Sequence, residues 1–406
     1  MSRARPPLLV ELATRSRPLR VGLVGAGKFG QMYVNQAQRV PGLELAWAAD
    51  LDLERARATG ARRVSDDALA LIETGEADVV IEASGSPGAG TRHALAAIEA
   101  GSHVVMVTVE ADVLAGPALS RRAAAAGVVY SLAYGDQPAL ICELVDWARL
   151  SGFTVTCAGK GTRYEAGFEF VTPDTVWEHY GQQPANADAQ MFTSFVDGSK
   201  SAIEMAAVCN ACNLAPQDGG LRFPRIESRG LAGLGNTVSR SGTVEVVAGD
   251  EMRWGVYVVF EVGDAFAAAS LAEYGVQVDE TGSYGALYRP YHLIGLELAT
   301  SVVRAGIRGE ATGTAQMLNA EAVARAKRNL EPGDKLDGEG GNAAYGILMS
   351  ATDSRACDAL PIGLSKGATV ERAIAKGELV RHADVALQPA TRLVAELRDE
   401  SFAIGR

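Results

Sequence analysis

The hexapeptide GAGKFG, which contains Gly25, Gly27 and Gly30, constrains the fold of this chain more than any other feature. It follows the apolar run RVGLVG and opens a stretch with helical periodicity, and Asp50 ends the next apolar run. Glycines at this spacing allow a tight turn, the helix N-terminus can receive a pyrophosphate, and Asp50 can hydrogen-bond a ribose diol. The sequence therefore predicts a strand-turn-helix unit that binds a dinucleotide.

Further apolar runs alternate with helical stretches up to about residue 150, and they read LELAWAAD, ADVVIEAS, SHVVMVT and VVYSLAY. This alternation predicts an α/β domain of the Rossmann class, a doubly wound parallel sheet with helices on both faces. The loops ASGSPGAG and TVEAD should lie at the carboxyl edge of that sheet, where a nicotinamide binds. The predicted cofactor contacts are Gly25, Gly27, Lys28, Phe29, Gly30, Asp50, Ser84, Gly85 and Glu110.

The residues alone leave the choice between NAD and NADP open. Asp50 and Asp52 should repel a 2′-phosphate, whereas a group of nearby arginines should attract one. Those arginines are Arg55, Arg57, Arg62 and Arg63.

Composition excludes several classes of protein. The net charge of -11 argues against a nucleic-acid partner, because basic residues cluster only in an N-terminal arm. Glu11 in that arm disfavours an organelle transit peptide. No apolar run reaches the roughly 18 residues that span a bilayer, so we expect a cytoplasmic protein with no membrane partner. The five cysteines fit a reducing compartment, and the CxxC of Cys209 and Cys212 lacks the further ligands of a zinc site.

A second domain is expected after residue 150. The segment FTVTCAGKGTRY begins a new strand, and GTVEVV and WGVYVVFEV alternate like half-buried strands, which together predict an α+β substrate domain. Lys160 lies between two glycines and is expected just past the first of these strands. It is either a ligand contact or a surface lysine, and the residues alone do not decide between them.

The segment FVDGSKSAIEMAAV predicts a helix on which Asp197, Lys200, Ser201 and Glu204 share one face. The face becomes apolar after Glu204, which predicts a helix buried nearly all round. Its charged patch must then be paired or must face a water-filled cleft. We favour the wall of an active site over a structural ion pair.

The segment YGALYRPYHLIGLELATSVV predicts another helix, beginning at Pro290. Arg289 and His292 flank this helix start. A guanidinium beside a helix N-terminus suits an anionic substrate group.

The last part of the chain changes to short strands and glycine turns. The phrase L-x-x-G-D/E-x-L/V occurs at 330–336 and, in a related form, at 374–380, which predicts β-turns in a small β-rich module. The expected organisation is an arm at 1–18, a dinucleotide-binding domain at 19–150, a catalytic and dimerisation domain at 151–309 and the β-rich module at 310–406.

Over most of its length the chain resembles the deoxyxylulose-5-phosphate reductoisomerase-like proteins, a homoserine-dehydrogenase-like group with a C-terminal SAF-like module. The motifs that carry this resemblance are RVGLVGAGKFG, VMVTVEADV, LAYGDQPALICELVDWAR, AGKGTRY, TPDTVWEHYG, DGSKSAIEMAAV, RWGVYVVFE, YRPYHLIGLELA and KLDGEGG. The resemblance implies an NADPH-dependent homodimer that converts a small phosphorylated ketose, 1-deoxyxylulose 5-phosphate, to methylerythritol 4-phosphate in isoprenoid synthesis.

The resemblance also implies roles for particular residues. Lys160 and Lys200 would stabilise oxyanions, and Glu204 or Asp197 would move protons. Arg289, with Arg163 and His292, would bind the anionic substrate. A divalent cation near the two acids is left open.

A simple dehydrogenase of a small hydroxy acid or semialdehyde is the alternative function. The chain has Glu110 where homoserine dehydrogenases carry a lysine, which argues against its being an ordinary homoserine dehydrogenase. A non-catalytic nucleotide sensor is disfavoured, because it would not need the charged residues Asp197, Lys200 and Glu204.

Overall fold

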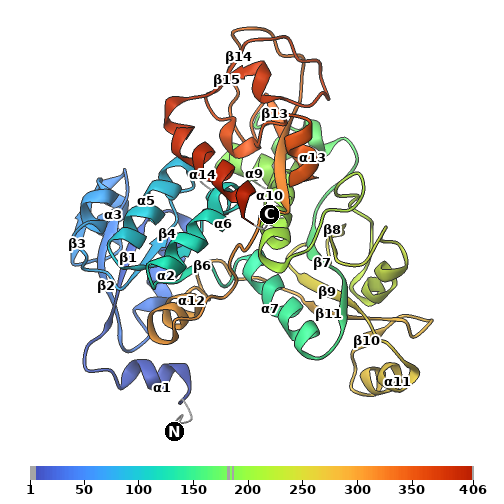
Figure 1. Cartoon of the computed structure of the whole chain (residues 1–406), viewed down its shortest axis with the longest axis horizontal. Helices are drawn as coiled ribbons and strands as arrows, with labels where there is room; N and C mark the ends of the chain where they lie inside the picture. Colours follow the sequence, from blue (N-terminus) through green and yellow to red (C-terminus); the bar gives the residue numbers. More distant parts are fainter. Residues whose placement is uncertain (1–5, 181–182, 185–186, 405–406) are drawn as a thin grey trace. The chain divides into compact units, whose positions relative to one another are not determined.

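The computed structural model describes residues 6–180, 183–184 and 187–404 (Figure 1). They form two compact units, each assembled from separate stretches of the chain. The first unit contains residues 1–140, 293–316 and 396–406, and the second contains 141–292 and 317–395. The contiguous domain limits expected from the sequence stay a prediction.

The first unit is built on a parallel six-stranded sheet with the order β3-β2-β1-β4-β5-β6, which confirms the predicted Rossmann domain. The strands are β1 (Leu19–Val24), β2 (Leu43–Ala49), β3 (Arg63–Ser65), β4 (Val79–Glu82), β5 (His103–Met106) and β6 (Tyr130–Leu132). The helices that follow them are α2 (Lys28–Ala37), α3 (Leu53–Ala58), α4 (Ala68–Ile72), α5 (Pro87–Glu99) and α6 (Val109–Ala125). The next helix, α7 (Gln137–Leu150), begins in the first unit and continues into the second.

The core of the first unit includes residues from a distant part of the chain. Leu19, Leu23 and Ile81 of the central strands pack with Leu298 and Val302, all fully buried. Val302 lies in α12 (Ala299–Val303), which continues into the π-helical turn Arg304–Arg308. The N-terminal helix α1 (Leu8–Ala13) is tied to this turn by an ion pair between Arg308 and Glu11 (3.0 Å).

The second unit is built on a mixed five-stranded sheet with the order β10-β11-β9-β7-β8. Its strands are β7 (Thr154–Thr162), β8 (Thr243–Ala248), β9 (Val256–Glu261), β10 (Gln277–Val278) and β11 (Tyr284–Arg289). The helices are α8 (Val176–Tyr180), α9 (Ala189–Val196), α10 (Ser199–Cys212) and α11 (Ala265–Glu273). The 3-10 segments Phe168–Phe170 and Ser228–Asn236 complete this part. The strands expected from GTVEVV and WGVYVVFEV are confirmed.

Helix α10 lies between this sheet and a second, antiparallel ladder formed by β12 (Ala320–Ala326) and β13 (Ala344–Ser350). Every residue of α10 except Lys200 is buried, as its apolar composition predicted. The predicted continuous helix from residue 195 onward is wrong. Asp197 ends α9, and Gly198, with φ of 87°, breaks the chain before α10 begins.

The helix predicted to begin at Pro290 is also wrong. Residues 284–289 form β11, which pairs residue by residue with β9 from Tyr284 opposite Glu261 to Arg289 opposite Val256. Gly285 permits this packing, because a Cβ there would overlap the ring of Phe260. Arg289 is therefore the last residue of a strand.

The two related phrases near the C-terminus pair with each other. Leu330 and Ile374 exchange backbone hydrogen bonds of 2.8 and 2.9 Å, and Gly333 and Gly377 both adopt positive φ at the turns. The other short elements of this part of the chain are α13 (Ala351–Ala356), the 3-10 turns Ile362–Leu364, His382–Asp384 and Pro389–Thr391, and the paired strands β14 (Thr369–Val370) and β15 (Val385–Ala386). The last helix, α14 (Arg392–Ala403), begins in the second unit and ends in the first.

Candidate functional site

A cavity of about 940 Å³ opens at the carboxyl ends of the strands of the first unit. It brings together four of the predicted cofactor residues, which are Gly25, Gly27, Asp50 and Ser84. The other five lie outside its lining: Lys28 and Phe29 begin α2, Gly30 packs within that helix, Gly85 lies in the loop after β4, and Glu110 is buried at the start of α6.

The glycine-rich turn is shaped for close approach. Gly25 has φ of 88°, and a Cβ there would overlap the carbonyl oxygen of Ala83. A Cβ on Gly30 would overlap the carbonyl oxygen of Gly25, whereas Gly27, the N-cap of α2, faces open space. The backbone at Gly27 can therefore approach a phosphate at the N-terminus of α2, so the turn fits a dinucleotide pyrophosphate.

The backbone of the glycine-rich turn also fixes Asp50. One carboxylate oxygen accepts the N–H of Ala26 (2.7 Å), and the other accepts the N–H of Asp52 (2.9 Å). The carboxylate thus lies on the cavity wall with its orientation set before a ligand arrives. This is the position from which an acid binds the ribose hydroxyls of a dinucleotide.

One wall of this cavity was not predicted from the sequence. Ala89, Arg92 and His93 form it from one face of α5, where they are spaced i, i+3 and i+4. The His93 ring lies 3.1 Å from the buried carboxylate of Glu82, which also accepts the N–H of Ser84 (3.2 Å). Asp66, Asp67 and Ser86 are further lining residues without a sequence signal of their own.

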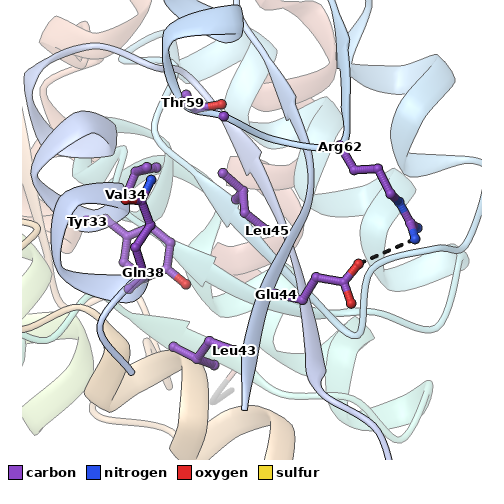
Figure 2. A pocket seen from close by; sticks show the side chains of 10 residues that line it. Tyr33, Val34, Gln38, Leu43, Glu44, Leu45, Thr59 and Arg62 are labelled. Carbon is purple, nitrogen blue, oxygen red and sulfur yellow. Dashed lines mark ion pairs between the residues drawn. The ribbon is translucent and has the colours of Figure 1, made fainter. Parts of the chain in front are cut away.

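A smaller cavity of about 310 Å³ in the first unit lies between α2 and β2 (Figure 2). Apolar side chains such as Leu43 and Leu45 line it, and an ion pair between Arg62 and Glu44 (3.5 Å) lies at its side. Its lining includes none of the predicted cofactor residues. The glycine-rich cavity is therefore the candidate cofactor site.

In the second unit, two predicted catalytic residues meet. Lys160, near the end of β7, forms an ion pair with Glu204 of α10, and both side chains are largely buried. Its neighbours Gly159 and Gly161 have a structural role, because a Cβ on either would overlap a carbonyl oxygen, of Glu245 or Met252 respectively. The glycines therefore allow tight packing of the sheet and do not by themselves indicate a ligand.

Asp197 lies in a different environment. Its carboxylate is 2.7 Å from the ammonium of Lys327 and accepts the N–H of Ser199 (2.8 Å). Burial raises the pKa of Asp197, and Lys327 and Ser199 oppose that rise. Lys327 also donates to the carbonyl oxygens of Val171 (2.6 Å) and Gly341 (2.8 Å). The contacts of Asp197 are those of a structural ion pair.

The predicted substrate-binding residues are held by neighbours in the second unit. Arg163 donates to the carbonyl oxygen of Tyr180 (3.0 Å), and the guanidinium of Arg289 lies 4.8 Å from the ring of Tyr291. The Nδ1 of His292 is 2.9 Å from the carbonyl oxygen of Trp254. The role of these three residues in substrate binding stays a prediction. Lys200, which was predicted to be catalytic, is the half-buried residue of α10, and its role also stays a prediction.

The described residues were searched for clusters of metal-ligating side chains. Within 6–180, 183–184 and 187–404, no group of three or more His, Cys, Asp or Glu side chains is placed to hold a metal ion. Asp197 and Glu204 each bind a lysine instead. In the same ranges, no helix combines the length and apolarity that crossing a bilayer requires.

Two family models match adjacent parts of the chain. Residues 19–132 match the Gfo/Idh/MocA model, described as an oxidoreductase family with an NAD-binding Rossmann fold. Residues 135–298 match the catalytic domain of oxidoreductase DRL. The chain carries the two domains of an NAD(P)-dependent oxidoreductase. Its cofactor is NAD or NADP.

These matches correct the predicted family. The assignment to the deoxyxylulose-5-phosphate reductoisomerase-like proteins is wrong, because the nucleotide-binding half matches the Gfo/Idh/MocA oxidoreductases. Neither match extends past residue 298, so a SAF-like module at 310–406 is not shown. No curated protein matches this oxidoreductase.

Solved structures with partial likeness include three oxidoreductases. The WlbA dehydrogenase of Bordetella pertussis, in complex with NADH and UDP-GlcNAcA, is 25% identical over 38% of this chain and 46% of that one, with a TM-score of 0.32. The myo-inositol dehydrogenase of Lactobacillus casei is 20% identical over 39% and 50%, with a TM-score of 0.29. The putative oxidoreductase yvaA of Bacillus subtilis is 12% identical over 74% and 92%, with a TM-score of 0.41. This chain spans about half the length of the first two.

Proposed function

We propose that this oxidoreductase is a simple dehydrogenase that interconverts a small hydroxy compound, such as a hydroxy acid, and the corresponding carbonyl compound or semialdehyde. The observation that carries the proposal is the pair of adjacent family matches, an NAD-binding domain followed by an oxidoreductase catalytic domain. A nicotinamide cofactor, when bound, supplies hydride chemistry at carbon. The residues of the chain then have to bind the substrate and move one proton.

Lys160 and Glu204 are the proposed proton-handling residues. Alcohol oxidation removes a hydride from carbon and a proton from the hydroxyl oxygen, so a base must take that proton, and carbonyl reduction returns it. In a pair of an ammonium and a carboxylate, the carboxylate can accept that proton and later return it. The Lys160–Glu204 pair, which joins β7 to α10, has this chemistry.

Arg163, Lys200, Arg289 and His292 are proposed to bind an anionic group of the substrate. Their cationic or hydrogen-bonding side chains favour a carboxylate over a neutral alcohol. This places small hydroxy acids and acidic semialdehydes ahead of neutral sugars as substrates.

We also propose NAD as the preferred cofactor. The cavity is lined by Asp50, Asp52, Asp66 and Asp67 against the cations Arg55 and Arg92. Arg55 is already within 3.3 Å of Asp52. The 2′-phosphate of NADP would meet this acidic wall, whereas the ribose hydroxyls of NAD can donate to Asp50.

The test is oxidation of NADH and NADPH by the purified protein with aspartate semialdehyde and small keto acids, followed by identification of the product. We expect NADH oxidation with at least one of these carbonyl compounds and formation of the matching alcohol. A folded protein that binds NADH but reduces none of them would overturn the proposed reaction.

A further inference from the structure

A separate cavity of about 350 Å³ lies in the second unit, on the other side of α10 from the proposed proton-handling residues. Gly198 and Ala202 line it. Each residue turns a helix by about 100°, so Lys200 and Glu204 lie on the opposite side from this pair. The residues lining the cavity include neither Lys160 nor Glu204.

Two arginines line this cavity, and neither has a carboxylate at ion-pair distance among the described residues. Arg222 reaches the carbonyl oxygen of Thr237 (3.4 Å), and Arg325 reaches that of Gly377 (3.2 Å). The Nε of Arg325 is buried with no hydrogen-bond partner in the described part of the chain. Neither arginine forms an ion pair with a carboxylate in the described part of the chain, although the charge of Arg222 opposes the rise that burial gives the pKa of Glu245.

The acids of the same cavity are already engaged. Glu169 accepts the hydroxyl of Tyr164 (3.0 Å) and the N–H of Gly167 (2.9 Å). Asp197 is held by Lys327 (2.7 Å). Glu169 keeps its negative charge, because neutral donors do not cancel it, but neither acid of the wall forms an ion pair with Arg222 or Arg325.

An aromatic wall completes the cavity. The rings of Tyr164 and Phe223 stack with centroids 3.9 Å apart and an angle of 18° between their planes. Phe223 holds a left-handed backbone with φ of 53°, which is rare for a bulky residue and persists only where the surroundings enforce it. The buried carboxylate of Glu245 enforces it, because it accepts the N–H groups of Arg222 (3.0 Å) and Phe223 (3.4 Å).

We propose that this cavity binds a small organic anion, with its carboxylate or phosphate group between Arg222 and Arg325 and a flat body against Tyr164 and Phe223. Guanidinium groups suit both oxyanions, and the volume is that of a small-ligand site. Tyr345, on β13, lines the same cavity, so both the five-stranded sheet's loops and the C-terminal ladder build the site. This inference goes beyond the proposed dehydrogenase function and does not depend on it.

The test is isothermal titration calorimetry of the full chain with benzoate, phenyl phosphate and the neutral analogue benzyl alcohol. We expect at least one anion to bind about tenfold or more tightly than benzyl alcohol, and the tighter of the two anions distinguishes a carboxylate ligand from a phosphate ligand. Arg222→Gln and Arg325→Gln should each weaken that binding by about tenfold or more, the usual loss for a hydrogen bond to a charged group.

Each variant has a matched control on the same segment. Arg225→Gln and Arg328→Gln remove the same charge from exposed ion pairs with Glu165 and Asp334, and both should bind the anion like the parent protein. Oxidation of NADH should be unchanged in all four variants. Failure of both anions to bind, undiminished binding in folded Arg222→Gln, or loss of turnover in that variant would each overturn the proposal of a separate anion site.

Discussion

Two lysine–carboxylate pairs flank the start of α10, and they differ in what surrounds them. The side chains of Lys327 and Asp197 are 1% and 0% exposed, and the ammonium contacts Asp197 and two carbonyl oxygens. The side chains of Lys160 and Glu204 are 8% and 6% exposed. Similar residue types in one domain therefore divide into a sealed pair and a pair that keeps some accessible surface, and we propose that the second pair handles the substrate proton.

We expect the strongest effect of a substitution at the sealed pair of Lys327 and Asp197. Lys327→Met should lower the free energy of unfolding by about 3–5 kcal/mol, because it leaves Asp197 buried without its counter-charge. Urea unfolding measures this loss. The matched control is Arg328→Gln on the adjacent, exposed pair with Asp334, which should cost less than about 1 kcal/mol. Equal losses of unfolding free energy in the two variants would contradict a structural role for Lys327.

The next strongest effect is expected on turnover, at the Lys160–Glu204 pair, which keeps some accessible surface. Glu204→Gln should reduce turnover by about 10²–10⁴-fold, because the amide cannot accept the substrate proton, and it should leave the affinity for NADH intact. Steady-state kinetics and NADH titration together measure both quantities, with the exposed Glu165→Gln as a control. Parent-like turnover would make the Lys160–Glu204 pair structural as well.

Asp112 is another buried acid, and among the described residues its carboxylate is bonded to the hydroxyl of Tyr130 and to no cation. Burial raises the pKa of Asp112 to about 7, although the hydroxyl of Tyr130 (2.9 Å) opposes the rise. The unfolded chain releases this proton near pH 4, so between about pH 4 and 7 the folded state holds more protons. The contribution of Asp112 to the free energy of unfolding is therefore largest below about pH 4 and falls as the pH rises to about 7.

Asp112→Asn should remove that part of the pH dependence, which amounts to a few kcal/mol at most. Urea unfolding at pH 5 and pH 8 measures the change, and the difference between the two pH values should shrink in the variant. An unchanged difference would show that Asp112 does not carry a raised pKa.

The sequence predicted those features that depend on neighbouring residues. The Rossmann sheet and the cofactor turn follow from periodic apolar runs and from GAGKFG, in which Gly25 adopts the positive φ that its position requires. The apolar character of α10 likewise predicted its burial.

The remaining features depend on contacts between distant segments. The ion pair of Asp197 with Lys327 could not be predicted, because Lys327 lies far along the chain and no spacing links the two, and a catalytic role for Asp197 stays a prediction. Arg289 was predicted to flank a helix because Pro290 is typical of a helix start. Its pairing with Val256 is a contact between distant segments, which local sequence does not reveal. The wall formed by Arg92 and His93 was missed because their contact with the cofactor cavity depends on how α5 packs.

Fluorescence titration of NADH and NADPH into the parent protein and Asp50→Ala tests the cofactor site directly. The proposal is that the cavity at Gly25 and Asp50 binds the nicotinamide cofactor and prefers NAD. It predicts that the parent binds NADH about tenfold or more tightly than NADPH and that Asp50→Ala narrows this preference, since the variant loses both the ribose acceptor and the repulsion of the 2′-phosphate. Tighter binding of NADPH by the parent, or an unchanged preference in the variant, would contradict it.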